Sequence, residues 1–598
     1  MKNSVKRLIN LFVAAALILV VSACEDDEPT PAAPTVSEPS STDVRIGESS
    51  SFNFNVEVPG GFESSTVTQT GGTAQITSNL SSGDVEGTIT VEFTAGSSTG
   101  AGSVKLTVND TNGNTTSSTV VFSVTAPDAP QVTPPAAATV TEKTTNSMTF
   151  AVSTPGGYTS VAATATGGNV TVTSEPDAGS TSGDVVVDFE ATTPGSGSVT
   201  VTVTDAANQS ASATASLTIE EEVVPTVIVS ENIDGTVTWE TGNVYQLAGR
   251  ITVLDGGVLN IQKGVIVKGQ PGTGANATAL LVARGGTLNA AGEADMPIIF
   301  TSSADEISPS DVAAGNFASP NLAPDVSGLW GGVIVLGKAK ISTTNKESGA
   351  QLSEVQIEGI PTSDPNGLYG GSEDGDNSGT INYISIRHGG SNIGSGNEIN
   401  GLTLGGVGSG TTISNVEVVA NQDDGIEFFG GTVSVTNAVI WNGNDDGLDT
   451  DMAWNGTVDN FVIIAPNTAG AHCFELDGPE GTYENGNHTL KNGTVVASVG
   501  DRGAEDLINT DENSNVNLTN IFITGIKAGQ DINRTDAANV VFTGIELDIP
   551  AGAALADFVS GTIPTGVTAA STPSTGVGAD LSAFAWTWAS TSAEWPGN

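Results

Sequence analysis

Positive charge and cysteine are scarce in this 598-residue chain. It carries 18 Lys+Arg against 67 Asp+Glu, a formal net charge of −49, and it has only two cysteines. An acidic surface repels phosphate backbones, and the sequence contains no basic patch to offset this repulsion. We therefore exclude nucleic acid as a partner, whereas the same charge favours divalent cations.

Aromatic and charged residues are also few, at 5% and 14%, while glycine occupies 74 positions. Coiled coils and helical bundles need windows rich in Ala, Glu, Lys and Leu, so both classes are excluded. Val and Ile recur regularly among Gly, Ser and Thr, which indicates β structure with many turns. At the usual domain size this length predicts several domains. We predict an all-β chain.

Residues 1–24 have the pattern of an export signal. The apolar residues 8–21 are too few for a stable membrane span, and they follow a basic start formed by Lys2, Lys6 and Arg7. Residues 21–24 read Val-Ser-Ala-Cys and resemble a lipobox. This resemblance implies that Cys24 is acylated, with palmitate among the chains, and anchors the mature protein in the membrane. The alternative is an ordinary secretory signal with an incidental cysteine.

Residues 25–35 are predicted to form a tether, because they combine an acidic run with several prolines. An acidic run directly after the anchor resembles the surface-export signal of Bacteroidetes-type lipoproteins, which implies an outer-membrane protein exposed on the cell surface. The alternative is a tether that is merely solvated. With Cys24 acylated, Cys473 has no partner for an intramolecular disulfide, and its apolar context predicts a small buried side chain.

Two related β-sandwiches are predicted at 36–126 and 127–222. Both segments alternate apolar and polar residues, and Pro-Gly-Gly-Phe from Pro59 recurs as Pro-Gly-Gly-Tyr from Pro155, an offset of 96. About seven short strands in each segment fit an immunoglobulin-like (Ig-like) sandwich without the usual Cys and Trp. Neither segment contains histidine, so we interpret them as a stalk without catalytic residues.

Residues 223–598 are predicted to form a right-handed parallel β-helix. Asparagine precedes an apolar strand repeatedly, at Asn382, Asn415, Asn437, Asn460, Asn492 and Asn520, and the last five are spaced by 22, 23, 32 and 28 residues. Stacked coils would bring these amides within about 4.8 Å, where each can bond to the next coil. Such an asparagine ladder resembles the pectate-lyase-like β-helices. The alternative is a set of unrelated turn residues.

Carboxylates repeat at the same distances from the ladder. Asp424, Asp446 and Asp501 follow their asparagine by nine residues, whereas Glu427, Asp449 and His472 follow by twelve. Stacked like charges favour protonation or a bound cation, and Ca²⁺ prefers carboxylate oxygens. We predict a Ca²⁺ site from Asp423, Asp424, Asp445, Asp446, Glu427 and Asp449. The alternative is that the Asp-Asp-Gly units are turns in which Asp caps backbone amides.

Aromatic residues border this predicted site, and we predict that they bind sugar by stacking or, alternatively, that they pack in the core: Phe428, Phe429, Trp441 and Trp454. Three further tryptophans, Trp586, Trp588 and Trp595, are predicted to cap the open C-terminal end of the β-helix or, alternatively, to form a sugar-binding platform.

Carbohydrate is the predicted ligand class. We predict a surface-anchored lipoprotein whose β-helix binds an extracellular polysaccharide or surface partner, with Ca²⁺ assisting. The alternative is a Ca²⁺-dependent polysaccharide lyase or a glycoside hydrolase, as the resemblance implies. The catalytic candidates are then His472, Arg502, Asp449 and Glu475. The hydrolase signatures of the superfamily, such as Gly-His-Gly and Arg-Ile-Lys, do not occur in the sequence.

Overall fold

The computed structural model describes residues 31–391, 399–465 and 471–597. The described chain is all-β and divides into two units, the second of which begins at Val223. The predicted signal at 1–24 with Cys24, and residues 25–30 of the predicted tether, lie outside the described residues. Within the described ranges, no helix is long and apolar enough to cross a membrane.

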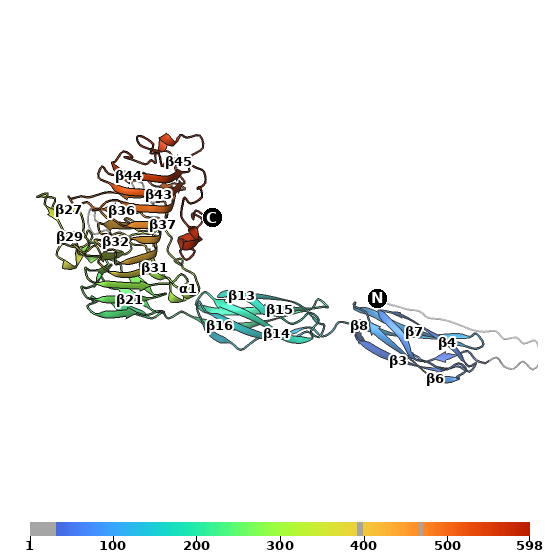
Figure 1. Cartoon of the computed structure of the whole chain (residues 1–598). Coiled ribbons are helices and arrows are strands. Elements are labelled where there is room, and N and C mark those ends of the chain that lie inside the picture. Colours follow the sequence, from blue (N-terminus) through green and yellow to red (C-terminus); the bar gives the residue numbers. More distant parts are fainter. Residues whose placement is uncertain (1–30, 392–398, 466–470, 598) are drawn as a thin grey trace, which may run out of the picture. The chain divides into compact units, whose positions relative to one another are not determined.

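The first unit contains two Ig-like β-sandwiches, each built from two four-stranded sheets (Figure 1). Residues alternate between core and solvent along each strand, as Phe52 and Phe54 do with Asn53 and Asn55. The first sandwich consists of β1 (Thr35–Val36), β3 (Ser49–Glu57), β6 (Glu86–Ala95) and β5 (Gly72–Ser78), packed on β2 (Val44–Arg45), β8 (Thr115–Thr125), β7 (Gly100–Asp110) and β4 (Phe62–Thr70).

The second sandwich repeats this design. It consists of β13 (Gly168–Ser174), β14 (Ser182–Ala191), β11 (Thr145–Ser153) and β9 (Gln131–Thr133), packed on β10 (Ala138–Thr141), β16 (Ser210–Glu220), β15 (Gly195–Asp205) and β12 (Tyr158–Thr166). One repeated acid closes the same hairpin in both domains. Asp110 accepts hydrogen bonds from the backbone of Asn112 and Asn114, and Asp205 does so from Ala207 and Gln209. These buried aspartates therefore stabilise turns.

The second unit is a right-handed parallel β-helix whose strands stack in chain order (Figure 1). One of its sheets, here the short-strand sheet, has eight parallel strands. They are β20 (Ile251–Val253), β23 (Leu280–Val282), β26 (Val333–Leu336), β32 (Leu402–Gly405), β34 (Ile426–Phe429), β36 (Leu448–Asp451), β38 (Phe474–Leu476) and β42 (Asn509–Thr510).

The other large sheet of the β-helix, here the long-strand sheet, begins with short separate strands and continues with longer strands that run through a bend. It contains β17 (Thr226–Val229), β18 (Thr236–Trp239), β19 (Val244–Leu247), β21 (Val258–Gln262), β22 (Ile266–Gly269), β24 (Thr287–Ala291), β25 (Ile298–Ser302), β31 (Gly379–Arg387), β33 (Thr412–Val419), β35 (Val435–Trp441), β37 (Thr457–Ile464), β39 (His488–Val496), β43 (Asn515–Thr524), β44 (Asn539–Leu547) and β45 (Val567–Ala569). A short helix, α1 (Pro309–Ala313), lies in a connection.

The asparagine ladder marks the bend in the long strands. Asn415, Asn437 and Asn460 have φ of 53°, 60° and 62°, and asparagine tolerates this left-handed conformation. The amide of Asn437 donates to Asn415 at 2.9 Å, and that of Asn460 donates to Asn437 at 2.8 Å. The ladder is thus confirmed. The prediction for Asn382 is wrong by one residue: Asn382 pairs with Ser414, and Tyr383 holds the positive φ at the ladder position of that coil, although the Oδ1 of Asn382 still accepts from the amide of Asn415.

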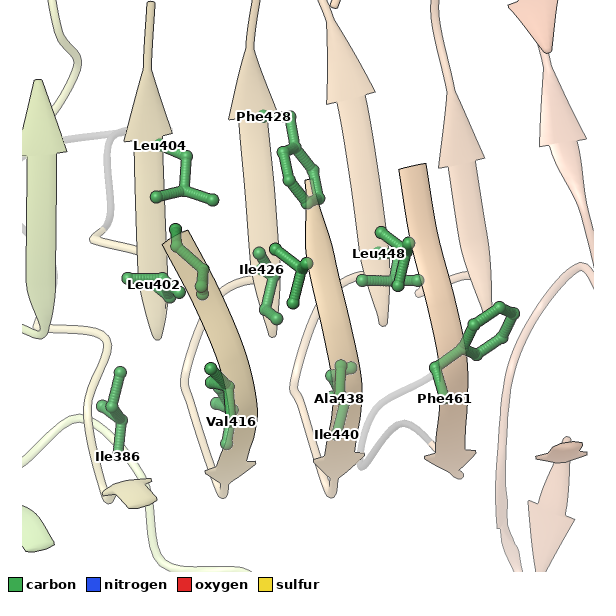
Figure 2. Close-up of a cluster of buried hydrophobic side chains, with 14 of the residues drawn as sticks. Ile386, Leu402, Leu404, Val416, Ile426, Phe428, Ala438, Ile440, Leu448 and Phe461 are labelled. Atoms are coloured by element: carbon green, nitrogen blue, oxygen red, sulfur yellow. The ribbon is translucent and has the colours of Figure 1, made fainter. Parts of the chain in front are cut away.

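Apolar side chains from both sheets fill the interior of the β-helix. Figure 2 shows Leu402, Ile426 and Leu448 of the short-strand sheet facing residues of the long-strand sheet such as Val416 and Ala438. Each coil buries its face only against its neighbours, so stability comes from stacking.

The C-terminal segment corrects one expectation. Trp588 and Trp595 are buried, but they pack with Val439, Trp441 and Val462 on the outer side of the middle coils. The C-terminus accordingly lies beside β37 in Figure 1, and not at the last coil. The predicted cap of the open end is wrong because the chain folds back along the side of the β-helix.

Candidate functional site

A column of acids runs along the outer face of the short-strand sheet. Side chains alternate in each strand, so Ile426 and Leu448 point inward whereas Glu427 and Asp449 point outward. Parallel pairing places Glu427 beside Asp449, and Asp449 beside Glu475. Predicted site residues more than 20 positions apart in sequence thus become neighbours.

A second column lies in the turns that precede these strands. Asp424 accepts a hydrogen bond from the backbone N–H of Asp446 at 2.9 Å, and Asp446 accepts one from the backbone N–H of His472 at 2.5 Å. Each buried carboxylate therefore fastens one coil to the next. The cap role given above as the alternative to a metal site is present at both positions.

We use the name acidic strip for seven carboxyl residues: the five in the two columns, together with Asp451 and Asp477, which each lie two residues after a column residue. They are Asp424, Glu427, Asp446, Asp449, Asp451, Glu475 and Asp477.

Counting from the ladder misplaces two residues. Glu475, and not His472, pairs with Asp449, whereas His472 stacks on Asp446 with its Nδ1 at 3.0 Å from the Asp446 Oδ1. The connection before β38 is three residues longer than the two before it, which shifts the count. For a similar reason Asp501 is exposed in a turn between β40 (Ser498–Val499) and β41 (Arg502–Gly503), outside the acidic strip.

The crowding of carboxyl groups changes their proton affinity. Burial and then neighbouring carboxylates raise the pKa of Asp424, Glu427 and Asp449 well above its ordinary value. Burial together with Glu480 raises the pKa of Asp451 to about 8. Burial together with Asp446 raises the pKa of Glu475 to about 8.

The pKa of His472 is also raised, but for a histidine this favours the charged form. Its partial burial disfavours the charged ring, but the hydrogen bond and the negative charge of Asp446 outweigh this and raise the pKa of His472 to about 9. At neutral pH the ring of His472 is therefore protonated.

The carboxylates form groups of a size that suits a cation. In two groups, Asp423 with Asp424 and Asp445, and Asp424 with Glu427 and Asp449, one oxygen from each residue lies within 4.8 Å of the others. A third group combines Asp446, His472 and Glu475. The six predicted metal ligands are thus distributed over three groups.

Asn400 joins the second of these groups, although none of the sequence patterns described above points to it. It is 1% exposed, its Nδ2 donates to Glu427, and its Oδ1 is buried without a hydrogen-bond partner. Asn400-Gly401 precedes β32 as Asp424-Gly425 precedes β34, which is the signal that could have identified it.

The predicted sugar-stacking residues are buried, so that prediction is wrong. Phe428 and Trp454 stack on each other inside the core, with ring centroids 4.0 Å apart. Phe429 packs near Tyr369, and Trp441 lies under the C-terminal segment, where its Nε1 donates to Glu594 at 2.8 Å. None of the four is more than 6% exposed. Core packing, the alternative given above, accounts for them.

Arg502 does not serve the acidic strip. Its guanidinium pairs with Glu594 at 2.5 Å and donates to Asn442. A lyase needs a basic residue beside its metal, and among the described residues no lysine or arginine forms an ion pair with Asp424, Glu427 or Asp449. The role of Arg502 as a lyase base is therefore not supported by its contacts.

The family comparison agrees with the parallel β-helix. The family model of the pectate-lyase-like β-helix domain matches residues 231–588. This chain belongs to that family. No curated protein matches the sequence.

Solved structures resemble about a third of the chain. The titin domains Z1Z2 in complex with telethonin align at 19% identity and a TM-score of 0.23, covering 32% of this chain and 100% of theirs. The fibronectin(III)-like modules of Clostridium thermocellum CbhA align at 14% identity and a TM-score of 0.14, covering 31% of this chain and 94% of theirs. The sialic acid binding region of a Streptococcus sanguinis adhesin aligns at 8% identity and a TM-score of 0.13, covering 32% of this chain and 78% of that region.

Proposed function

We propose that this protein is a lipid-anchored protein of the outer cell surface, and that its β-helix binds an extracellular polysaccharide with the help of Ca²⁺. The lipobox-like segment ending at Cys24 and the acidic residues after it support the location. Membership of the pectate-lyase-like family supports carbohydrate as the ligand class. The two Ig-like sandwiches, which carry no histidine, fit the role of a stalk.

One observation carries the calcium part of this proposal. Oxygens of Asp424, Glu427 and Asp449 lie within 4.8 Å of one another, and the buried Oδ1 of Asn400 beside Glu427 has no partner. Carboxylate and amide oxygens are the ligands that Ca²⁺ prefers. A bound cation would satisfy the amide oxygen and offset the burial and the mutual repulsion that together raise the pKa of these acids.

The strip also limits how sugar is bound. Because the candidate aromatic residues are buried, recognition rests on hydrogen bonds from sugar hydroxyls to half-buried carboxylates such as Asp449 and Asp477. A polysaccharide that carries uronic acids would be repelled by the bare strip and attracted to the calcium-loaded one. We therefore propose an anionic polysaccharide as the favoured ligand.

A calcium titration tests this site. We expect 1 mM Ca²⁺ to raise the melting temperature of the β-helix by about 2–4 °C, because a ligand that binds only the folded state stabilises it. All seven tryptophans lie after residue 223, so their fluorescence follows this domain alone. Glu427→Gln should abolish the shift, whereas Asp536→Asn, outside the strip, should retain it. A parent protein without any shift would contradict the calcium site.

Glycan retention tests the ligand class. The full chain is incubated with immobilised uronic-acid and neutral polysaccharides in Ca²⁺ or in chelator. We expect Ca²⁺-dependent retention of the uronic-acid polymers and its loss in Glu427→Gln. Retention that is equal in chelator would remove calcium from the binding mechanism.

A glycoside hydrolase is the second candidate, and Glu475 favours it. This half-buried carboxyl has a pKa of about 8, so it is protonated at neutral pH, and it pairs with Asp449 on the next coil. Inverting and retaining hydrolases both place two carboxyl groups at the scissile bond, one of which acts as the acid. New reducing ends during incubation, lost in Glu475→Gln, would identify a hydrolase. Absorbance of unsaturated uronate would identify a lyase instead.

A further inference from the structure

His472 is the one histidine that is both partly exposed and placed among carboxylates. His388 and His488 are 0% and 2% exposed, and they contact Val326 and Thr450. The side chain of His472 is 15% exposed, and its Nδ1 lies 3.0 Å from the Oδ1 of Asp446.

We propose that Asp446, His472 and Glu475 form a second metal site, which takes Zn²⁺ or a similar transition-metal ion. One ligand atom from each residue lies within 4.8 Å of the other two. Two ligands of a tetrahedral ion at metal–ligand distances of about 2.1 Å lie about 3.4 Å apart, so Nδ1 and Oδ1, which are 3.0 Å apart, need to separate only slightly to hold the ion between them. The site shares no residue with the group of Asp424, Glu427 and Asp449, so it goes beyond the calcium proposal.

The donor set determines which cation is preferred. Imidazole nitrogen with two carboxylates suits Zn²⁺, whereas Ca²⁺ favours oxygen ligands alone. The second ring nitrogen of His472 faces the Oδ2 of Asp506 at 3.9 Å. A carboxylate behind a ligating histidine orients the ring in many metal sites. Three protein ligands, two of them half-buried, also leave room for a water or a sugar oxygen as the fourth.

The competing role for His472 is a simple ion pair with Asp446, which would bind no metal. The test uses the full chain with Ca²⁺ in excess, so that oxygen-only sites are filled. Zn²⁺ is titrated by calorimetry, and Co²⁺ serves as a visible-light probe of nitrogen and oxygen coordination. We expect one Zn²⁺ per chain and Co²⁺ absorption bands.

His472→Gln and Glu475→Gln should each weaken Zn²⁺ binding by at least about tenfold and remove the Co²⁺ bands, while the Ca²⁺-induced melting shift stays. Asp506→Asn should weaken it by a few-fold only. Tryptophan fluorescence reports whether each variant folds, and with two ligand variants one misfolded protein does not decide the question. An absence of Zn²⁺ binding in the parent, or unchanged binding in folded His472→Gln, would overturn the proposal. Loss of the Ca²⁺ shift alone would affect only the calcium site.

Discussion

The asparagine ladder on the long-strand sheet and the acidic strip on the short-strand sheet both repeat one kind of side chain on successive coils. An amide both donates and accepts, so Asn437 bonds to Asn415 on one side and to Asn460 on the other. Ionised carboxylates only accept, so Glu427, Asp449 and Glu475 cannot satisfy one another. The ladder is complete without a ligand, whereas the strip calls for a proton or a cation.

The largest expected effect is in the ladder. Asn437→Ala removes two hydrogen bonds and puts alanine at a φ of 60°, so we expect it to destabilise the β-helix by about 3 kcal/mol. Denaturant unfolding followed by tryptophan fluorescence measures this. Asn437→Gly separates the contributions, because it keeps the left-handed conformation and loses only the bonds. A cost below about 1 kcal/mol for Asn437→Ala would mean that the ladder does not stabilise the fold.

Converting one amide to an acid tests the chemistry directly. Asn437→Asp keeps the shape of the side chain but loses the donor to Asn415, so we expect a cost of about 2 kcal/mol at pH 7. The cost should shrink below about pH 4, where the new carboxyl is protonated and can donate again. The same loss at both pH values would show that charge and donor capacity are unimportant there.

In the acidic strip, replacing an acid by an amide should stabilise the β-helix, whereas the changes at Asn437 destabilise it. Asp451 has a pKa of about 8, raised by burial and by Glu480, so its folded form holds a proton that the unfolded chain has released above about pH 4. Stability is therefore highest at low pH and falls as pH rises from about 4 to 8. Without added cation, Asp451→Asn should stabilise the β-helix by about 1–2 kcal/mol at pH 8 and by less at pH 4. The pH dependence of the melting temperature measures this, and a variant that is less stable at pH 8 would contradict it.

Much of this comparison could be predicted from the sequence. The asparagines precede similar strands at similar spacing, so the ladder and the closeness of Asp424 to Asp446 followed from stacking alone. Counting from Asn460 places His472 beside the wrong neighbour, because the connection before β38 is longer and the count cannot show where the extra residues lie.

The prediction that the aromatic residues bind sugar is wrong for a different reason. Phe428 lies two residues after Ile426 on the same strand, so its side chain points inward as well, and alternation along the strand could have placed it in the core. Phe429 points outward, but it is covered by Tyr369 from a distant connection, and Trp441 is covered by the C-terminal segment. Long-range cover of this kind leaves no local pattern in the sequence.

One exception inside the ladder supplies the smallest test. The amide of Asn492 donates to the carboxylate of Asp459 at 2.7 Å, and Lys491 pairs with the other oxygen of Asp459 at 3.1 Å. Where the ladder includes an acid, a lysine accompanies it, whereas Asp449 in the strip has no such neighbour among the described ion pairs. Lys491→Met should cost only about 0.5 kcal/mol, since the lysine is 39% exposed, and the cost should fall in high salt. A double variant with Asp459→Asn should cost less than Lys491→Met alone, because an amide at 459 needs no cation. If the double variant costs more, Lys491 acts through packing of its side chain, and the contrast between ladder and strip loses this support.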